Sequence, residues 1–221
     1  MFGTTLSAML IASESLWYAQ TNTYVIAPEA GRPAIIVDAP PDPEAILELV
    51  ARYDLTPTAL LLTHGHIDHT GGAGTVVDRT GAMAYVHPDD DYLTLNPLEQ
   101  LRALFGMTPE GDFAPPRQFE PLVDGESLRL AGLDIEVLHT PGHTPGHCCF
   151  LLQNSLFSGD HLFAGSIGRT DLPGGDMEAL LESMRAKILP LADETTVYPG
   201  HGPSTTIAAE RRSNPFLQGL S

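Results

Sequence analysis

Short apolar runs alternate with amphipathic segments along the chain, and this pattern predicts strands separated by helices. The strand-like runs are rich in β-branched and aromatic residues, and some are apolar throughout, as in strands buried on both faces. These predicted strands are residues 15–26, 33–40, 58–63, 83–87, 127–139, 147–152, 155–160 and 195–202. Within 127–139, two alternating runs flank Ala131-Gly132, which predicts a hairpin.

Two segments have the periodicity and the capping residues of helices. Residues 42–53 begin with Asp42 as N-cap and Pro43 at the first helical position, and residues 176–189 begin with Asp176 as cap. The predicted inward positions are Ile46, Leu47 and Val50 in the first helix and Met177, Leu180, Leu181 and Met184 in the second.

This order of elements predicts an α/β fold with sheets covered by outer helical layers. A length of 221 residues suits one sizeable core, so residues 1–221 are predicted to form a single domain. Residues 88–120 are rich in proline and are predicted to be an irregular excursion.

The balance of charge narrows the range of partners. Eleven basic residues against 28 acidic ones give a net charge of −17, which repels phosphate backbones and disfavours a nucleic-acid partner. The segment 6–19 is only mildly apolar and is interrupted by Glu14, so neither a signal peptide nor a membrane span is expected. Cys148 and Cys149 are adjacent and are predicted to be buried, reduced thiols, which favours a cytoplasmic location.

The strongest chemical signal is "LLTHGHIDHTGG", residues 61–72, which follows an apolar strand. His64 and His66 are two residues apart, so in extended chain both imidazoles point the same way and can reach one metal ion. Asp68 and His69 come at the following bend and can face a second position close by. The alternative is a set of solvated or capping side chains in a glycine-rich loop, but four ligand-type residues in six positions favour a metal site.

Further candidate ligands also follow predicted strands. They are His139, His143 and His147 in "HTPGHTPGH", Asp160 and His161 in "FSGDH", and His201 in "YPGHGP". A carboxylate such as Asp160 is costly to bury after an apolar strand without a cation, whereas between two metals it can bridge both.

The motifs H-x-H-x-D-H, T-P-G-H-T, S-G-D and P-G-H, in this order, resemble those of the metallo-β-lactamase superfamily. The resemblance implies an αββα four-layer sandwich with a metal site at one edge. By position it implies His64, His66 and His143 around a first metal, Asp68, His69 and His201 around a second, and Asp160 as the bridge.

Within the superfamily, the segment "GSIGRTDLPGGD", residues 165–176, is similar to short proteins of the glyoxalase II (hydroxyacylglutathione hydrolase) type. The true β-lactamases lack a bridging aspartate at the Asp160 position, and flavodiiron proteins carry glutamate where His66 stands. The tRNA-processing ribonucleases work on polyanions, which the net charge of −17 disfavours. The resemblance therefore implies hydrolysis of S-acyl thioesters such as S-lactoylglutathione. Full-length glyoxalase II holds glutathione with a C-terminal helical domain that has no match here, so relaxed thiol specificity is expected.

The implied cofactors are two divalent metal ions, with Zn²⁺ favoured and Fe or Mn also suited to the His and carboxylate set. Metal binding lowers the pKa of water from about 15.7 to near 7, so a metal-bridging hydroxide would attack the thioester carbonyl. Asp68 is predicted to be catalytic, because it would hold the second metal and orient that hydroxide. The leaving thiol has a pKa of about 8.5 and needs no strong general acid.

Other polar residues have structural and functional interpretations. Arg169 is a candidate contact for a substrate carboxylate, the alternative being an ion pair with Asp171. His139 and His147 are expected to make structural hydrogen bonds, His161 to pack or to line the rim of the pocket, and His87 to be a surface or loop residue. Gly71, Gly72 and Gly74 are expected to allow close backbone packing near the metals. The functional alternatives are a mononuclear iron persulfide dioxygenase that shares the superfamily ligands, a lactonase, and a binding module with a decayed site.

Overall fold

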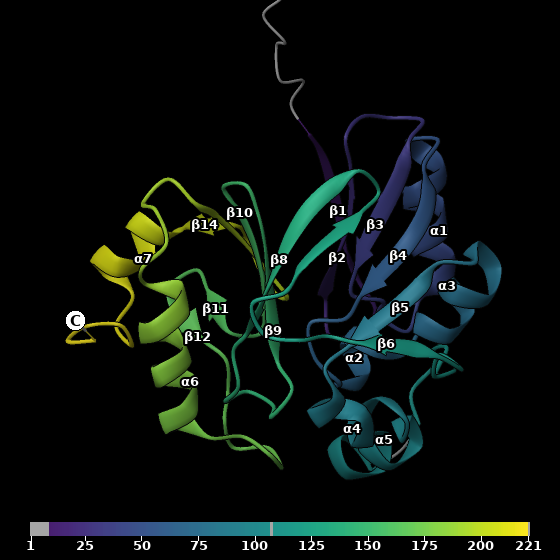
Figure 1. Ribbon diagram of the computed structural model, residues 1–221. Helices are drawn as coiled ribbons and strands as arrows, with labels where there is room; N and C mark the ends of the chain where they lie inside the picture. The colour runs from purple at the N-terminus through teal and green to yellow at the C-terminus, as the bar shows by residue number, and fades with distance from the viewer. Residues whose placement is uncertain (1–8, 107, 221) are drawn as a thin grey trace, which may run out of the picture.

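Two six-stranded sheets pack face to face in the computed structural model, which describes residues 9–106 and 108–220 (Figure 1). The first sheet has the order β1-β2-β3-β4-β5-β6, and the second has the order β14-β13-β10-β9-β8-β7. The first consists of β1 (Leu10–Leu16), β2 (Thr21–Ala27), β3 (Pro33–Val37), β4 (Thr56–Leu61), β5 (Met83–Val86) and β6 (Phe119–Pro121). The second consists of β7 (Ser127–Leu130), β8 (Leu133–His139), β9 (Cys148–Leu152), β10 (Ser155–Gly159), β13 (Thr196–Pro199) and β14 (Thr205–Thr206). The strands β11 (Leu162–Phe163) and β12 (Ser166–Ile167) form a small hairpin.

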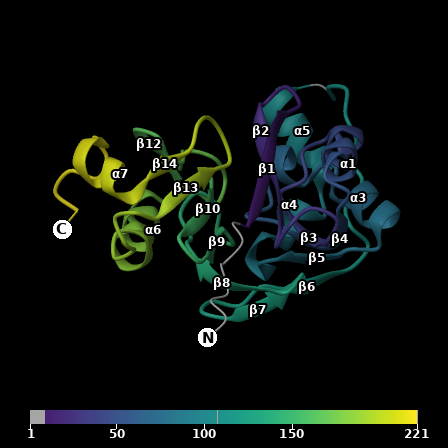
Figure 2. The same cartoon turned by 90° about the horizontal axis from the view of Figure 1, so that it is seen from above.

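Helices cover the outer face of each sheet, so the predicted αββα sandwich is confirmed (Figure 2). The helices α1 (Pro43–Arg52) and α3 (Ala73–Thr80) lie on the first sheet. The helix α6 (Met177–Ser183), its π-helical continuation η2 (Met184–Ile188) and α7 (Ile207–Ser213) lie on the second. The short helices α2 (Ile67–Thr70), η1 (Pro88–Asp90), α4 (Asp91–Thr94) and α5 (Pro97–Phe105) lie at one edge of the first sheet.

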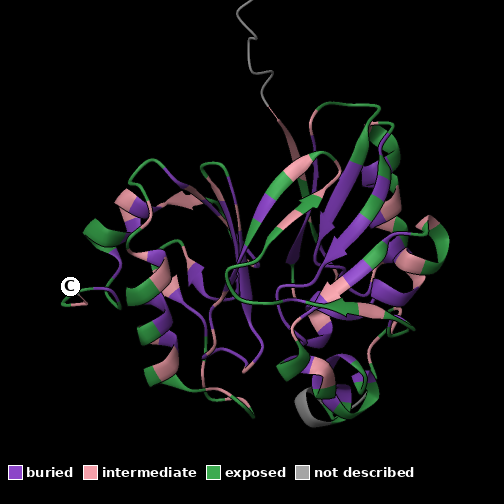
Figure 3. Cartoon of the chain, in the orientation of Figure 1, coloured by how far each residue is buried: buried purple, intermediate pink, exposed green. Residues whose placement is uncertain are grey.

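Three clusters of buried apolar side chains correspond to this architecture. Figure 3 shows that buried residues occupy much of the strands, whereas the exposed residues gather on the outer helices and loops. In β3, Ile35 and Val37 face the second sheet, whereas Ile36 faces the outer helices. Successive side chains of a strand point to opposite faces, so a strand covered on both sides is apolar throughout. Phe150 and Phe157 of the second sheet complete the layer between the sheets.

Local sequence signals place several elements as expected. Asp42 caps α1 by accepting a hydrogen bond from the backbone N–H of Ala45, and Asp176 caps α6 in the same way. The predicted hairpin at Ala131-Gly132 joins β7 to β8, and both residues have positive φ, 52° and 80°, as a type I′ turn requires.

The structure corrects four expectations. Residues 15–26 are not one strand, because a turn over residues 17–20 separates β1 from β2. Residues 88–120 are not an irregular excursion: they hold η1, α4, α5 and β6, and Pro97 occupies the first turn of α5, where a missing N–H costs nothing. In α1 the buried face uses Leu49 in place of Leu47, and Met177 of α6 is 44% exposed.

Cys148 and Cys149 are both buried free thiols, as predicted. They lie on opposite faces of β9, since Cys148 packs between the sheets and Cys149 packs toward the outer helices. Across residues 9–106 and 108–220, we find no helix with the length and apolar character needed to span a bilayer.

Candidate metal centre

The side chains of the candidate centre come from loops at one edge of the two sheets. His64 and His66 follow β4, and Asp68 and His69 lie on α2 directly after them. The second sheet supplies the other three side chains. His143 lies in the loop between β8 and β9, Asp160 directly follows β10, and His201 lies in the loop after β13. The structure therefore brings together all the residues that the motifs named as metal ligands.

Three imidazoles converge on one point. The Nε2 atom of His64 lies 3.1 Å from Nδ1 of His66, which lies 2.9 Å from Nε2 of His143. All three side chains are buried. Two nitrogens bound at 2.0–2.1 Å to a tetrahedral ion lie about 3.3 Å apart, so this spacing suits ligands of one metal ion.

A second set lies beside the first. The Nε2 atom of His69 is 3.4 Å from Nε2 of His201, and Oδ2 of Asp68 is 3.3 Å from the same His201 nitrogen. The Oγ1 hydroxyl of Thr21 donates to Oδ2 of Asp68, which fixes that carboxylate at the edge of β2.

Asp160 faces both sets. Its Oδ2 lies 3.6 Å from Nε2 of His143 and 3.5 Å from Nε2 of His201, and its Oδ1 lies 3.4 Å from Nε2 of His69. The Oδ1 atom is buried and has no hydrogen-bond partner among the described residues. Close to it, a Cβ at Gly200 would lie only 2.3 Å from that oxygen, so glycine is required there. A buried carboxylate oxygen without a partner is costly, and a cation would satisfy it.

Outer hydrogen bonds orient several of these side chains. Oδ2 of Asp38 lies 2.8 Å from Nδ1 of His69 and also accepts from the Thr63 hydroxyl. The backbone oxygen of Arg169 lies 2.7 Å from Nδ1 of His143. In each case the outer oxygen accepts a hydrogen bond from Nδ1–H, which leaves the lone pair of Nε2 free to bind a metal ion. Asp38 lies within the predicted strand 33–40 and directly follows β3, and nothing in its spacing identified it as a partner of His69.

Residues of the 88–105 segment hold the ligand loops in place. The buried carboxylate of Asp90 accepts hydrogen bonds from the backbone of Gly65 and Gly146 and from the hydroxyl of Thr144. It thereby ties the His64–His66 loop to the His143 loop across the two sheets. The side chain of Gln100 bonds to the backbone of Ile67 and Gly65 in the first loop. The sequence pattern gave no role to either residue.

The protonation states differ between the two sets. Burial, together with the neighbouring histidines, lowers the pKa of His64 well below its usual value and that of His66 to about 3. These imidazoles are therefore neutral near pH 7, which is the form that binds metal ions.

The second set is charged in the absence of a cation. Burial alone would lower the pKa of His69, but Asp160, Asp68 and Asp38 raise it well above its usual value. Burial is likewise outweighed at His201, where hydrogen bonds to Asp160 and Asp68 raise the pKa to about 9. His69 in turn holds the pKa of Asp160 well below its usual range, against the effect of burial. Protons on His69 and His201 thus neutralise two carboxylates that a metal ion could neutralise instead.

Two further histidines, His147 and His161, are buried. His147 is buried, lies 2.9 Å from the Thr140 hydroxyl and accepts a hydrogen bond from the backbone N–H of Asp160. His161 is also buried, and burial lowers its pKa to about 3. Neither of its ring nitrogens has a partner among the described residues.

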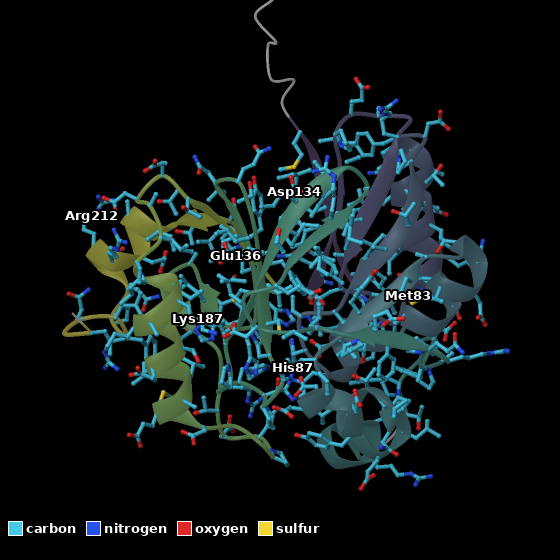
Figure 4. All side chains as sticks on the ribbon, viewed as in Figure 1. Met83, His87, Asp134, Glu136, Lys187 and Arg212 are labelled. Carbon is cyan, nitrogen blue, oxygen red and sulfur yellow. The ribbon has the colours of Figure 1, made fainter. Side chains whose placement is uncertain are left out.

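His87, labelled in Figure 4, stacks on His139 with ring centroids 4.0 Å apart and an angle of 6° between the planes. Asp89 lies close to this pair. Parallel stacked rings cannot aim their in-plane lone pairs at one ion, and the Nε2 atom of His139 already bonds the Pro145 oxygen. We therefore interpret this pair as a structural contact.

Two cavities adjoin the centre. One of about 480 Å³ contains Asp68, Asp160 and His201, and Arg169 lines its wall. The Arg169 guanidinium makes two hydrogen bonds of 2.7 Å to Asp171, so the ion pair considered from the sequence is present. The second cavity, of about 270 Å³, lies beside His66.

The sequence is similar to a known protein family. The family model of the metallo-β-lactamase superfamily matches residues 17–201. The chain belongs to the metallo-β-lactamase superfamily. It is 42% identical to the hydroxyacylglutathione hydrolase GloC of Haemophilus influenzae over 190 residues, which cover 85% of this chain and 89% of GloC.

Solved structures agree with this membership. The crystal structure of the BLEG-1 B3 metallo-β-lactamase has a TM-score of 0.87 at 40% identity and covers 95% of this chain and 100% of its own. The crystal structure of TTHA1623 in a di-iron-bound form has a TM-score of 0.82 at 41% identity, and the match covers 93% of this chain and 100% of the TTHA1623 chain. The chain is thus a hydrolase of this superfamily, with His and Asp clusters suited to metal ions. The ligand roles of the individual residues, the catalytic role of Asp68 and the substrate contact of Arg169 stay predictions.

Proposed function

We propose that the protein is a binuclear metal-dependent thioesterase of the glyoxalase II type. The observation that carries the proposal is the position of Asp160, whose two carboxylate oxygens face His143 on one side and His69 and His201 on the other. A carboxylate between two ligand sets suits two ions that share a bridge. The relative named as a hydroxyacylglutathione hydrolase supports thioesters as the substrate class.

The residues present fit two divalent cations. His64, His66 and His143 would hold the first, and Asp68, His69 and His201 would hold the second. When bound, such ions lower the pKa of a water molecule to near 7 and polarise the carbonyl under attack. We favour Zn²⁺, although a related protein has been crystallised in a di-iron form and the same ligands suit iron or manganese.

The protein's own groups would position the reaction. Asp68, held by the Thr21 hydroxyl, faces the 480 Å³ cavity and would accept a hydrogen bond from the attacking water. Asp38 and the Arg169 carbonyl fix the orientation of His69 and His143. The leaving thiol has a pKa of about 8.5, so it can depart as a thiolate without a general acid.

The test is hydrolysis of acyl thioesters, including S-lactoylglutathione, by protein whose metal content is measured in the same preparation. We expect two ions per chain, and an activity that a chelator removes and added metal restores. Absence of thioester hydrolysis by protein with both sites filled would refute the proposal.

A second candidate is β-lactam hydrolysis, which the 40% identity to the BLEG-1 B3 metallo-β-lactamase favours. A β-lactam and a simple lactone should therefore be included in the same panel. Oxygen consumption with a persulfide, from protein holding one iron per chain, would instead support the dioxygenase alternative.

A further inference from the structure

A second cavity opens directly beside the metal centre and has no assigned ligand. Its volume is about 270 Å³, and its lining residues are His66, Tyr92, Leu93, Asn96, Glu99, Gln100, Leu172 and Pro173. His66 and Leu172 also line the 480 Å³ cavity that holds Asp68 and Asp160. A substrate whose reacting carbonyl lies at the metals can therefore extend into both cavities at once.

The two cavities differ in chemistry. Leu93, Leu172 and Pro173 give the smaller cavity apolar walls, and its lining as described contains Glu99 but neither lysine nor arginine. Arg169 lines the larger cavity together with Asp68 and Asp160, and its guanidinium is hydrogen-bonded to Asp171. An anionic group is therefore repelled from the smaller cavity, and of the two cavities the larger one offers it a cationic side chain.

The walls of the smaller cavity are fixed by hydrogen bonds. The side-chain amide of Gln100 donates to the Leu93 backbone oxygen, and the same amide donates to Gly65 beside the metal ligands. Across the opening, the Tyr92 hydroxyl donates to the Pro173 oxygen at 3.5 Å. The cavity is thus formed by the short helices α4 and α5 on one side and the 172–173 segment on the other, so its shape exists before ligand arrives.

The volume sets the size of the group that fits. An apolar cavity of about 150 Å³ in a protein holds one benzene molecule. A cavity of about 270 Å³ therefore accommodates a medium-length alkyl or an aromatic acyl group, such as hexanoyl or phenylacetyl. A lactoyl group, with its hydroxyl, would leave most of this space unfilled and its apolar walls uncovered.

We propose that the 270 Å³ cavity is an acyl pocket that selects uncharged, apolar acyl groups larger than lactoyl. This inference rests on the proposed thioesterase function. The acyl group lies against Leu93 and Leu172, and the thiol portion, with any carboxylates, extends through the larger cavity toward Arg169. Each buried methylene strengthens binding of the reacting complex, so kcat/KM rises by about fourfold per added carbon until the pocket is full.

The experiment varies the two ends of the substrate independently, with protein of measured metal content. In one series the thiol is N-acetylcysteamine and the acyl group is acetyl, butanoyl, hexanoyl, lactoyl or phenylacetyl. In the other, the acyl group is acetyl and the thiol carries alkyl chains of increasing length. We expect kcat/KM to rise roughly fifteenfold from acetyl to butanoyl in the first series and to stay nearly flat in the second.

A matched pair of variants locates the effect. Asn96→Trp places a large ring in the pocket and should lower kcat/KM for hexanoyl at least tenfold more than kcat/KM for acetyl. Leu98→Trp adds the same ring two residues later, in the first turn of α5, at a residue that is 53% exposed and outside the lining, so its acyl profile should match the wild type. A loss of hexanoyl preference in both variants, or in neither, would overturn the location.

A binding measurement separates this inference from the proposed function. The probes are the S-hexyl and S-methyl thioethers of N-acetylcysteamine, which have no thioester bond to hydrolyse. Calorimetry should show that the hexyl compound binds with a negative heat-capacity change. Its affinity should be lower in Asn96→Trp. If no thioester is hydrolysed but this binding persists, the function is wrong and the apolar pocket stands. If thioesters are hydrolysed with a flat acyl profile, or with a preference that follows the thiol chain, the acyl pocket is wrong.

Discussion

Replacing Asp38 by asparagine should weaken one metal site selectively. In the native protein, Oδ2 of Asp38 accepts the Nδ1 proton of His69 at 2.8 Å, while Oδ1 accepts from the backbone N–H of Thr63. An asparagine that keeps its oxygen on Thr63 presents an NH₂ group to His69. The imidazole then carries its proton on Nε2, the atom that faces Asp160 and His201 and that would bind metal.

The substitution isolates this effect from changes of backbone and volume. Asp38 has a φ of 60°, a left-handed conformation that asparagine adopts readily. The two side chains are nearly the same size, so the 2% exposed site is neither emptied nor overfilled. Loss of an outer partner of a metal-ligating histidine costs roughly 10- to 100-fold in metal affinity, which is about 1.4–2.7 kcal/mol.

The assay is calorimetric titration of Zn²⁺ into metal-free wild type, Asp38→Asn and the control Asp54→Asn, an exposed aspartate on the same half of the fold. We expect the site formed by His64, His66 and His143 to keep its affinity and the other site to lose 10- to 100-fold in Asp38→Asn alone. Urea unfolding of the metal-free proteins verifies that each is folded. Equal loss at both sites, or no loss at either, would refute the tautomer argument.

Three further predictions concern the centre and its wall. Asp160→Ala should lower the occupancy of both metals, measured by elemental analysis, while costing less unfolding free energy than a core deletion; full metal content and activity would contradict the bridge. Arg169→Ala should raise KM more for acidic thioesters than for neutral ones, and equal effects would assign Arg169 to its ion pair with Asp171 alone. Metal binding at pH 7 should release protons, because the pKa of His201 is about 9 and that of His69 is raised before metal binds. Calorimetric titrations in buffers of different ionisation enthalpy measure this proton release. The metal affinity should rise as the pH rises toward 9. If no protons are released, His69 and His201 are not protonated in the metal-free protein.

These raised histidine pKa values also determine how the stability of the metal-free fold changes with pH. A histidine whose folded pKa lies above its unfolded value of about 6.5 stabilises the fold fully below that pH. For His201 this contribution is lost as the pH rises through about 9. Metal binding replaces it, so the metal-loaded protein should lose less stability over this range.

The layers and the candidate metal ligands were predictable because their signals are local. Strands such as 58–63 are apolar throughout, and each chemical motif directly follows a strand. Since the ends of neighbouring strands meet at one edge of a sheet, residues far apart in sequence could be expected to converge there. The net charge of −17 disfavours a nucleic-acid partner without any knowledge of the fold, and this stays a prediction.

The supporting residues were not predictable because their partners are distant in sequence. Asp38 bonds to His69 across 31 residues and Asp90 to Gly146 across 56, and no spacing rule links such pairs. The helices α4 and α5 were missed because they are short and lie in a segment rich in proline. The turn after β1 lacks glycine and proline, and its positive φ angles belong to Trp17 and Gln20, so composition gave no signal there.

The division of the centre between the two sheets has a consequence for the order of events during folding. His66 lies 77 residues before His143, and His69 lies 132 residues before His201. Contacts of such long sequence separation form late, after the loops between them have closed. During synthesis the first half of the chain can therefore present histidines but cannot complete a binding site. Metal uptake should follow the docking of the second sheet on the first, and a captured ion would then slow their separation.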